Sequence, residues 1–155
     1  MVGIGNPSRG DDAAGSRVAR QIRSMPRVYV IDAQDVPENY LCQIADQQPE
    51  TIVLIDCVDM KSAPGSVALF ENDETVPYWP STHRVPLSLI VDYLKRTTHA
   101  RVLLLAIQPR QTGLLQPVSP DVLSSVEMVA GMLNHALEHR DTSADTTLLR
   151  AEVPA

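Results

Sequence analysis

The sequence has little cysteine and few aromatic residues, and both shortages restrict what the protein can be. Of its 155 residues, two are cysteines and 4% are aromatic. Cys42 and Cys57 lie far apart and form no Cys-x-x-Cys pair, which argues against a secreted disulfide scaffold. Cys57 ends an apolar run and is predicted to be a buried, reduced thiol. With so few aromatic side chains, the core must be built from Val, Leu, Ile and Ala.

Excess positive charge and long apolar runs are also missing. The formal net charge is -6, which argues against nucleic acid or an anionic membrane as partner, because both bind clustered Lys and Arg. A cation or a basic peptide fits this charge better. The longest apolar runs, Ile52–Ile55 and Val102–Ile107, are too short to span a bilayer, and the N-terminus lacks the pattern of a signal peptide. We therefore expect a cytoplasmic protein with no nucleic acid and no membrane as partner.

Strand-like and helix-like patterns alternate along the chain. The run Thr51–Ile55 is apolar and rich in β-branched residues, as in a strand that is covered on both faces. Ser119-Pro120-Asp121 is a strong helix start, with a capping hydroxyl, a first-turn proline and an acid at the positive end of the dipole. The expected strands are residues 2–5, 28–31, 51–55, 67–70 and 102–107, and the expected helices are residues 13–25, 38–46, 86–96 and 120–139.

This alternation predicts the fold. Strands that alternate with helices form a mainly parallel sheet with helices on both faces. The prediction is an α/β protein, a three-layer αβα sandwich whose mainly parallel sheet has about five strands, with residues 67–70 at an edge. Residues 1–140 form the single expected domain, and the polar, unpatterned residues 141–155 are expected to be a disordered tail. No long apolar face is left over for a partner, so a monomer is expected.

Acidic and histidine side chains follow the ends of the expected strands. Asp11 and Asp12 come after the first strand, Asp56 after the third, and His83 lies in the loop after the next one. Further acids at the strand ends are Asp32, Asp35, Glu38 and Asp59. The carboxyl ends of parallel strands meet at one edge of the sheet, where ligands bind in such folds. One imidazole with two carboxylates suits nickel, zinc or iron, and three protein ligands leave coordination positions open.

Each of these side chains also has an ordinary structural explanation. Asp11 or Asp12 could cap the first helix, and Asp56 could accept a hydrogen bond from a neighbouring backbone amide in a turn. His83 could be a loop histidine without a ligand. Composition and spacing do not choose between these alternatives and a metal site.

Two familiar chemistries are not supported by the sequence. Gly3-x-Gly5 is followed by Ser8 where a dinucleotide-binding fingerprint has its third glycine. No Gly-x-Ser-x-Gly elbow is present, and Cys57 has no sequence signature of a nucleophile. A hydrolase of this sequence would therefore not be an obvious serine or cysteine enzyme.

The segment Gly3–Gly15 resembles the opening signature of the hydrogenase maturation endopeptidases. That signature is Gly-x-Gly-Asn, a short spacer, and an acidic pair before a helix that starts with small residues. Further similar segments follow in the right order, at Val36–Asn39, Leu54–Met60, Ala63–Gly65, Ser81–Leu87 and Ile107–Pro109. The resemblance spans about Met1 to Leu137, and its details are closest to the branch that serves formate-hydrogenlyase-type hydrogenases.

The resemblance implies an endopeptidase that removes a C-terminal peptide from the precursor of a [NiFe]-hydrogenase large subunit after nickel insertion. It places the family's metal-contacting residues on Asp12, Asp56 and His83, which leaves Asp11 as the helix cap. It also implies that nickel arrives within the substrate, so the expected partner is the nickel-loaded large-subunit precursor. An incomplete set of protein ligands agrees with a metal that the substrate brings.

The sequence departs from the family pattern in three places. Only Met1 and Val2 precede the first glycine, where family members carry several apolar residues, and this predicts that the chain begins further upstream. Asp-Asp-Ala-Ala-Gly replaces the commoner Asp-Asp-Gly at residues 11–15. Ala33 and Gln34 stand where glycines are often found, which leaves the shape of the substrate groove open.

Two other functions remain as alternatives. The opening also resembles the Gly-x-Gly-Asn-Pro of peptidyl-tRNA hydrolase, but that family's following Tyr and its Arg-His-Asn segment are absent, and an acidic chain suits tRNA poorly. A nickel- or precursor-binding module that does not cleave would carry the same motifs. Capture of the precursor without a change in mass would identify such a module.

Overall fold

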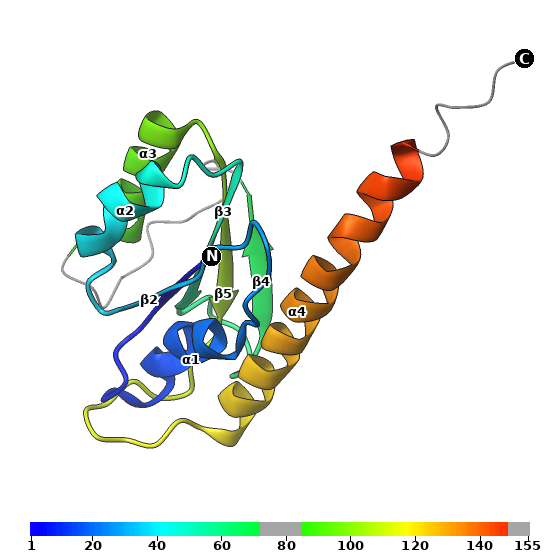
Figure 1. The fold of residues 1–155 in the computed structure, drawn as a ribbon. Helices are drawn as coiled ribbons and strands as arrows, with labels where there is room; N and C mark the ends of the chain where they lie inside the picture. The colour runs from blue at the N-terminus through cyan, green and yellow to red at the C-terminus, as the bar shows by residue number, and fades with distance from the viewer. Residues whose placement is uncertain (72–84, 149–155) are drawn as a thin grey trace, which may run out of the picture.

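The centre of the computed structural model, which describes residues 1–71 and 85–148, is a five-stranded sheet (Figure 1). Its strands are β1 (Val2–Ile4), β2 (Ile31–Gln34), β3 (Thr51–Cys57), β4 (Val67–Phe70) and β5 (Arg101–Ile107). They lie in the order β2-β1-β3-β5-β4, and all neighbours are parallel except β4 and β5. The predicted α/β fold with a mainly parallel sheet is confirmed, as is the edge position of residues 67–70.

The ladder between β3 and β5 forms the middle of the sheet. It pairs residues 51–57 with residues 101–107 without a shift in register. Successive side chains of a strand point to opposite faces, so Leu54 joins one core cluster and Ile55 joins the other. Both side chains are fully buried. Burial on both faces explains why this run of the sequence is continuously apolar.

Helices cover both faces of the sheet (Figure 1). The helical elements are α1 (Ala14–Gln21), α2 (Leu41–Asp46), α3 (Leu87–Thr98) and α4 (Pro120–Leu148), with two short 3-10 helices, η1 (Gly10–Ala13) and η2 (Pro37–Tyr40). α1 and α4 pack on one face, while α2 and α3 pack on the other. The three layers predicted from the sequence are therefore present.

The start of α1 rests directly on the backbone of two strands. A Cβ atom at Gly15 would lie 2.0 Å from the carbonyl oxygen of Ile55 and 2.3 Å from that of Ile4. No side chain fits there, so glycine permits the closest approach between the helix and the sheet. This contact holds η1, which immediately precedes α1, against the carboxyl ends of β1 and β3.

β2 begins later than predicted. The sequence predicts a strand at residues 28–31, whereas β2 covers Ile31–Gln34. β1 pairs with it from Val2 opposite Ile31 onward, so residues 28–30 have no ladder partner in β1. The apolar pattern correctly predicted a strand in this region, but the pairing with β1 determines where β2 begins.

α1 ends earlier than predicted. The sequence predicts a helix up to residue 25, whereas α1 ends at Gln21 and Ile22 is already extended, with ψ 128°. A side chain of α4 occupies this end: Asn134 Nδ2 donates to the Gln21 carbonyl at 3.0 Å, and Asn134 Oδ1 accepts from the Arg23 amide at 2.9 Å. The partner that ends α1 comes from a helix more than a hundred residues away along the chain.

α4 is longer than predicted. It continues to Leu148, past the expected end near His139, and extends beyond the body of the sheet (Figure 1). The part of the expected tail at residues 149–155 lies outside the described residues. Among the helices that the structure describes, none is long and apolar enough to cross a bilayer.

Candidate active site

Three acidic side chains are buried at the carboxyl edge of the sheet. Asp11 and Asp12 lie in η1, directly after β1, and Asp56 lies near the end of β3. Their residues are 0%, 1% and 3% exposed. The charges of all three act on the Cys57 thiol, so the structure brings them to one place. Buried carboxylates are costly unless hydrogen-bonded or paired, which makes the partners of each acid informative.

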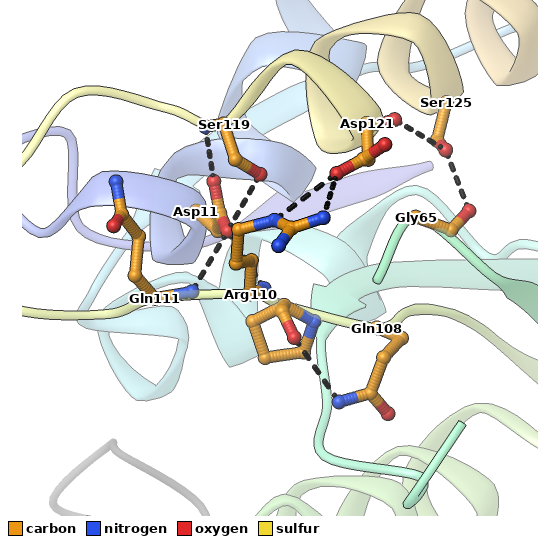
Figure 2. A network of polar contacts seen from close by, with 9 residues as sticks. Asp11, Gly65, Gln108, Arg110, Gln111, Ser119, Asp121 and Ser125 are labelled. Carbon is orange, nitrogen blue, oxygen red and sulfur yellow. Dashed lines mark hydrogen bonds and ion pairs between the residues drawn. The ribbon is translucent and has the colours of Figure 1, made fainter. Parts of the chain in front are cut away.

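Asp11 is held by four donors from the segment between β5 and α4 (Figure 2). Its Oδ2 accepts from the amides of Arg110 at 2.8 Å and Gln111 at 3.0 Å. Its Oδ1 accepts from the Ser119 amide at 2.6 Å, and the Ser119 hydroxyl donates to Oδ2 at 2.9 Å. This corrects the prediction that Asp11 caps the first helix, because neither η1 nor α1 has a side-chain cap. Asp11 instead ties the β1–α1 turn to the β5–α4 segment.

Asp12 is braced from within its own turn. Its Oδ2 accepts from the Asn6 amide at 2.9 Å, while the Asn6 side chain accepts from the Ser8 amide at 2.9 Å and donates to Asp35 at 3.1 Å. Gly5 lets this turn close, because it has φ 145° and a Cβ there would lie 1.8 Å from the Asp12 carbonyl oxygen. The turn therefore fixes the position of the Asp12 carboxylate relative to the end of β1.

Asp56 accepts a local hydrogen bond from the next residue. The Cys57 amide donates to Asp56 Oδ1 at 2.7 Å, which is the backbone contact that the sequence analysis left open. A carboxylate has two oxygens and several acceptor positions, so this bond is compatible with a further role as a ligand. Asp56 thus sits on the most extensively paired part of the sheet, beside the turn that holds Asp12.

The Cys57 thiol is a poor nucleophile. Burial raises its pKa, and the negative charges of Asp56, Asp12 and Asp11 act in the same direction. A thiolate is the reactive form of cysteine, so these acids disfavour it. Cys57 is a free, half-buried cysteine and Cys42 a free, exposed one. The carboxylates are therefore better candidates for the chemistry of this edge than the thiol.

Gln108 organises the loop after β3, a role that sequence reasoning missed. It is 6% exposed and follows β5 directly. Its Oε1 accepts from the Met60 amide at 2.6 Å, and its Nε2 donates to Asp59 at 3.1 Å. Hydrogen bonds from Lys61 and Gln108 lower the pKa of Asp59 to about 2. The sequence feature that could have indicated this role is the position of Gln108, a polar residue directly after a buried apolar strand.

The third predicted site residue, His83, lies outside the described residues. Among the side chains that the structure describes, in residues 1–71 and 85–139, no three His, Cys, Asp or Glu are arranged to hold a metal ion. The structure therefore shows two of the three residues predicted to contact the metal, Asp12 and Asp56, as buried carboxylates at this edge. The contact by His83 stays a prediction.

The sequence of this chain is similar to those of known hydrogenase maturation proteases. The family model of the HycI hydrogenase maturation proteases matches residues 14–136. A putative hydrogenase maturation protease of Methanocaldococcus jannaschii is 32% identical over 148 residues, covering 89% of this chain and 87% of that protein. The hydrogenase 3 maturation protease of Escherichia coli K12 is 31% identical over 132 residues, covering 83% of this chain and 84% of that protein.

A solved structure agrees with the sequence matches. The crystal structure of a [NiFe] hydrogenase maturation protease, HycI, from Thermococcus kodakarensis KOD1 superposes with a TM-score of 0.78 at 30% identity. The match covers 88% of this chain and 90% of the other. Sequence and fold therefore point to the same group of proteins over nearly the same residues.

Proposed function

The chain belongs to the hydrogenase maturation protease family, and from this premise we propose that Asp12, Asp56 and His83 contact the nickel ion of a large-subunit precursor. Membership makes the chain a peptidase that acts in hydrogenase maturation, and it makes a hydrogenase large-subunit precursor its kind of partner. The observation that carries the proposal is the burial of Asp12 and Asp56 side by side with Cys57, from two different strand ends.

Electrostatics favours a cation that comes and goes with the substrate. The residues Asp12 and Asp56 are 1% and 3% exposed, and carboxylate oxygens are ligands that divalent metal ions accept. A divalent ion carried by the precursor would add a favourable charge interaction to both carboxylates on binding. Two carboxylates and one imidazole leave coordination positions for ligands from the precursor itself. The site thereby distinguishes a loaded precursor from an empty one.

Recognition of the metal would also orient the scissile bond. A peptide held in a fixed position relative to a catalytic group needs less activation, and this term supplies several kcal/mol. A carboxylate at this edge would then act as general base toward water, a role that suits Asp and Glu. Serine and cysteine mechanisms fit less well, because the raised pKa of Cys57 opposes thiolate formation.

The enzyme is proposed to work as a cytoplasmic monomer. Its net charge of -6 disfavours nucleic acid and anionic membranes as partners. Neither the peptidyl-tRNA hydrolase alternative nor a module that binds without cleaving is favoured by a feature of the site, and the family matches are to peptidases.

The experiment is a comparison of intact masses. The protein is incubated with nickel-loaded large-subunit precursor and, separately, with nickel-free precursor. Loss of one C-terminal peptide in the loaded sample alone is the expected result. Cleavage of both samples would keep the peptidase activity and remove the nickel checkpoint. Cleavage of neither, with the precursor retained on the protein, would revive the binding module.

A further inference from the structure

Two neighbouring leucines project into solvent from the segment between β5 and α4. Leu114 is 66% exposed and Leu115 is 83% exposed. Among the described residues they are the only consecutive pair of large apolar side chains that are both exposed. Single exposed leucines are normal on a protein surface, whereas two adjacent ones form a small contiguous apolar patch. This pair, Leu114–Leu115, is called the leucine tip below.

The leucine tip is held in an unfavourable backbone conformation. Leu115 has φ 59°, in the left-handed region that branched, bulky side chains avoid. Its amide donates to the Ser8 carbonyl at 2.7 Å. The Gly113 amide donates to Gln116 Oε1 at 2.9 Å, which closes the turn. Glycine would adopt this conformation more readily, so the backbone conformation does not account for leucine at this position.

The leucine tip is rigidly connected to the candidate active site. Ser8, which accepts from Leu115, lies in the turn that ends in Asp12. The same segment is tied down on its other side by Asp11, through the amides of Arg110, Gln111 and Ser119 (Figure 2). The tip is therefore joined to the turn of Asp12 by one backbone hydrogen bond and to Asp11 through the flanking residues of its segment.

We propose that the leucine tip is an apolar anchor for the large-subunit precursor. The identity of this occupant rests on the proposed function. A peptidase that must find one bond in a folded protein uses contacts remote from that bond to orient it. The leucine tip is hydrogen-bonded through Leu115 to Ser8, in the turn that leads to Asp12, so a precursor that reaches this turn can also contact the tip.

Leu115→Gly is the decisive variant. Glycine removes the side chain and accepts φ 59° without strain, so thermal unfolding should be unchanged or shifted upward. The KM for nickel-loaded precursor should rise about 10-fold or more, while kcat changes less than about twofold, since burial of a leucine side chain against the precursor contributes binding energy. Leu114→Ser should change KM in the same direction.

Gln48→Gly is the matched control. Gln48 is exposed and has φ 46°, but it lies in the turn before β3, at the opposite edge of the sheet. The control therefore relieves the same kind of backbone conformation away from the site. Both KM and kcat should equal those of the wild type.

The outcomes separate the anchor from the proposed function. If the wild type cleaves the loaded precursor and Leu115→Gly has the same KM, the anchor is wrong and the function stands. If the wild type does not cleave, titration of labelled precursor against both proteins still decides, because a weaker Kd for Leu115→Gly supports the anchor. Equal or absent binding overturns it. A wild-type dimer that Leu115→Gly turns into a monomer, measured by sedimentation, would assign the tip to self-association and overturn the proposal.

Discussion

The two edges of the sheet differ in an instructive way. The amino edge has a cleft of about 1010 Å³, lined by Met1, Tyr29, Arg101 and Leu133 among others, and it contains none of the three buried aspartates. The carboxyl edge has those aspartates, packed among backbone amides. Large clefts are the usual first place to search for a site. Here the proposed site lies at the edge with the buried carboxylates and not at the edge with the larger cleft.

The largest expected effect is a loss of activity on substitution of the aspartates at the carboxyl edge, with no loss on substitution at the amino edge. Asp12→Asn and Asp56→Asn should each lower kcat/KM for loaded precursor by about 10³-fold or more, because a general base or metal contact is lost. Asparagine keeps an oxygen that accepts from the Asn6 and Cys57 amides, so the unfolding midpoint should hold. Rates are measured from intact masses over time.

A variant at the amino edge provides the control for this loss. Gln47→Ala removes an exposed side chain from the cleft and should leave kcat/KM unchanged. Full activity of both aspartate variants, or an equal loss in Gln47→Ala, would contradict the assignment of the chemistry to the carboxyl edge.

The next effect is a loss of stability, and it distinguishes Asp11 from the adjacent Asp12 at the same edge. Asp11→Ala leaves three backbone amides and the Ser119 hydroxyl without their acceptor. Unsatisfied buried donors are costly, so the free energy of unfolding should fall by about 3 kcal/mol or more. Urea denaturation measures the change. A stability equal to that of the wild type would show that the β5–α4 segment does not depend on Asp11.

The contrast between Asp11 and Asp12 also shows what sequence reasoning can and cannot reach. The edge that gathers Asp11, Asp12 and Asp56 was predictable, because parallel strands put their carboxyl ends together. The role of Asp11 was not, since its partners are residues 110–119, about a hundred positions along the chain. Adjacent acids before a helix look alike in sequence, and only tertiary contacts distinguish the structural one.

Element types were predictable for a similar reason, and element ends were not. The buried ladder of β3 and β5 is visible as two apolar runs. The end of α1 depends on Asn134 from α4, and the start of β2 depends on where β1 pairs with it. The local apolar pattern shows which residues are buried, whereas the ends of a helix or strand depend on tertiary contacts that the pattern does not contain. His83 remains a prediction, since it lies outside the described residues.

The smallest effect concerns Asp59, a half-buried acid at the carboxyl edge, in contrast to the three fully buried ones. The pKa of Asp59 is lowered to about 2, first by its hydrogen bond from Lys61 and then by that from Gln108. A carboxyl whose pKa is depressed by folding stabilises the protein above its unfolded value of about 4, and this contribution is lost as the pH falls toward 2. The advantage of wild type over Asp59→Asn in urea should therefore shrink between pH 6 and pH 3. Because the Asp59 side chain is 37% exposed, solvent screening keeps the difference small. Lys61→Gln removes the main cause of the lowered pKa and should flatten the same pH dependence, whereas an undiminished dependence in Lys61→Gln would assign the effect to another acid.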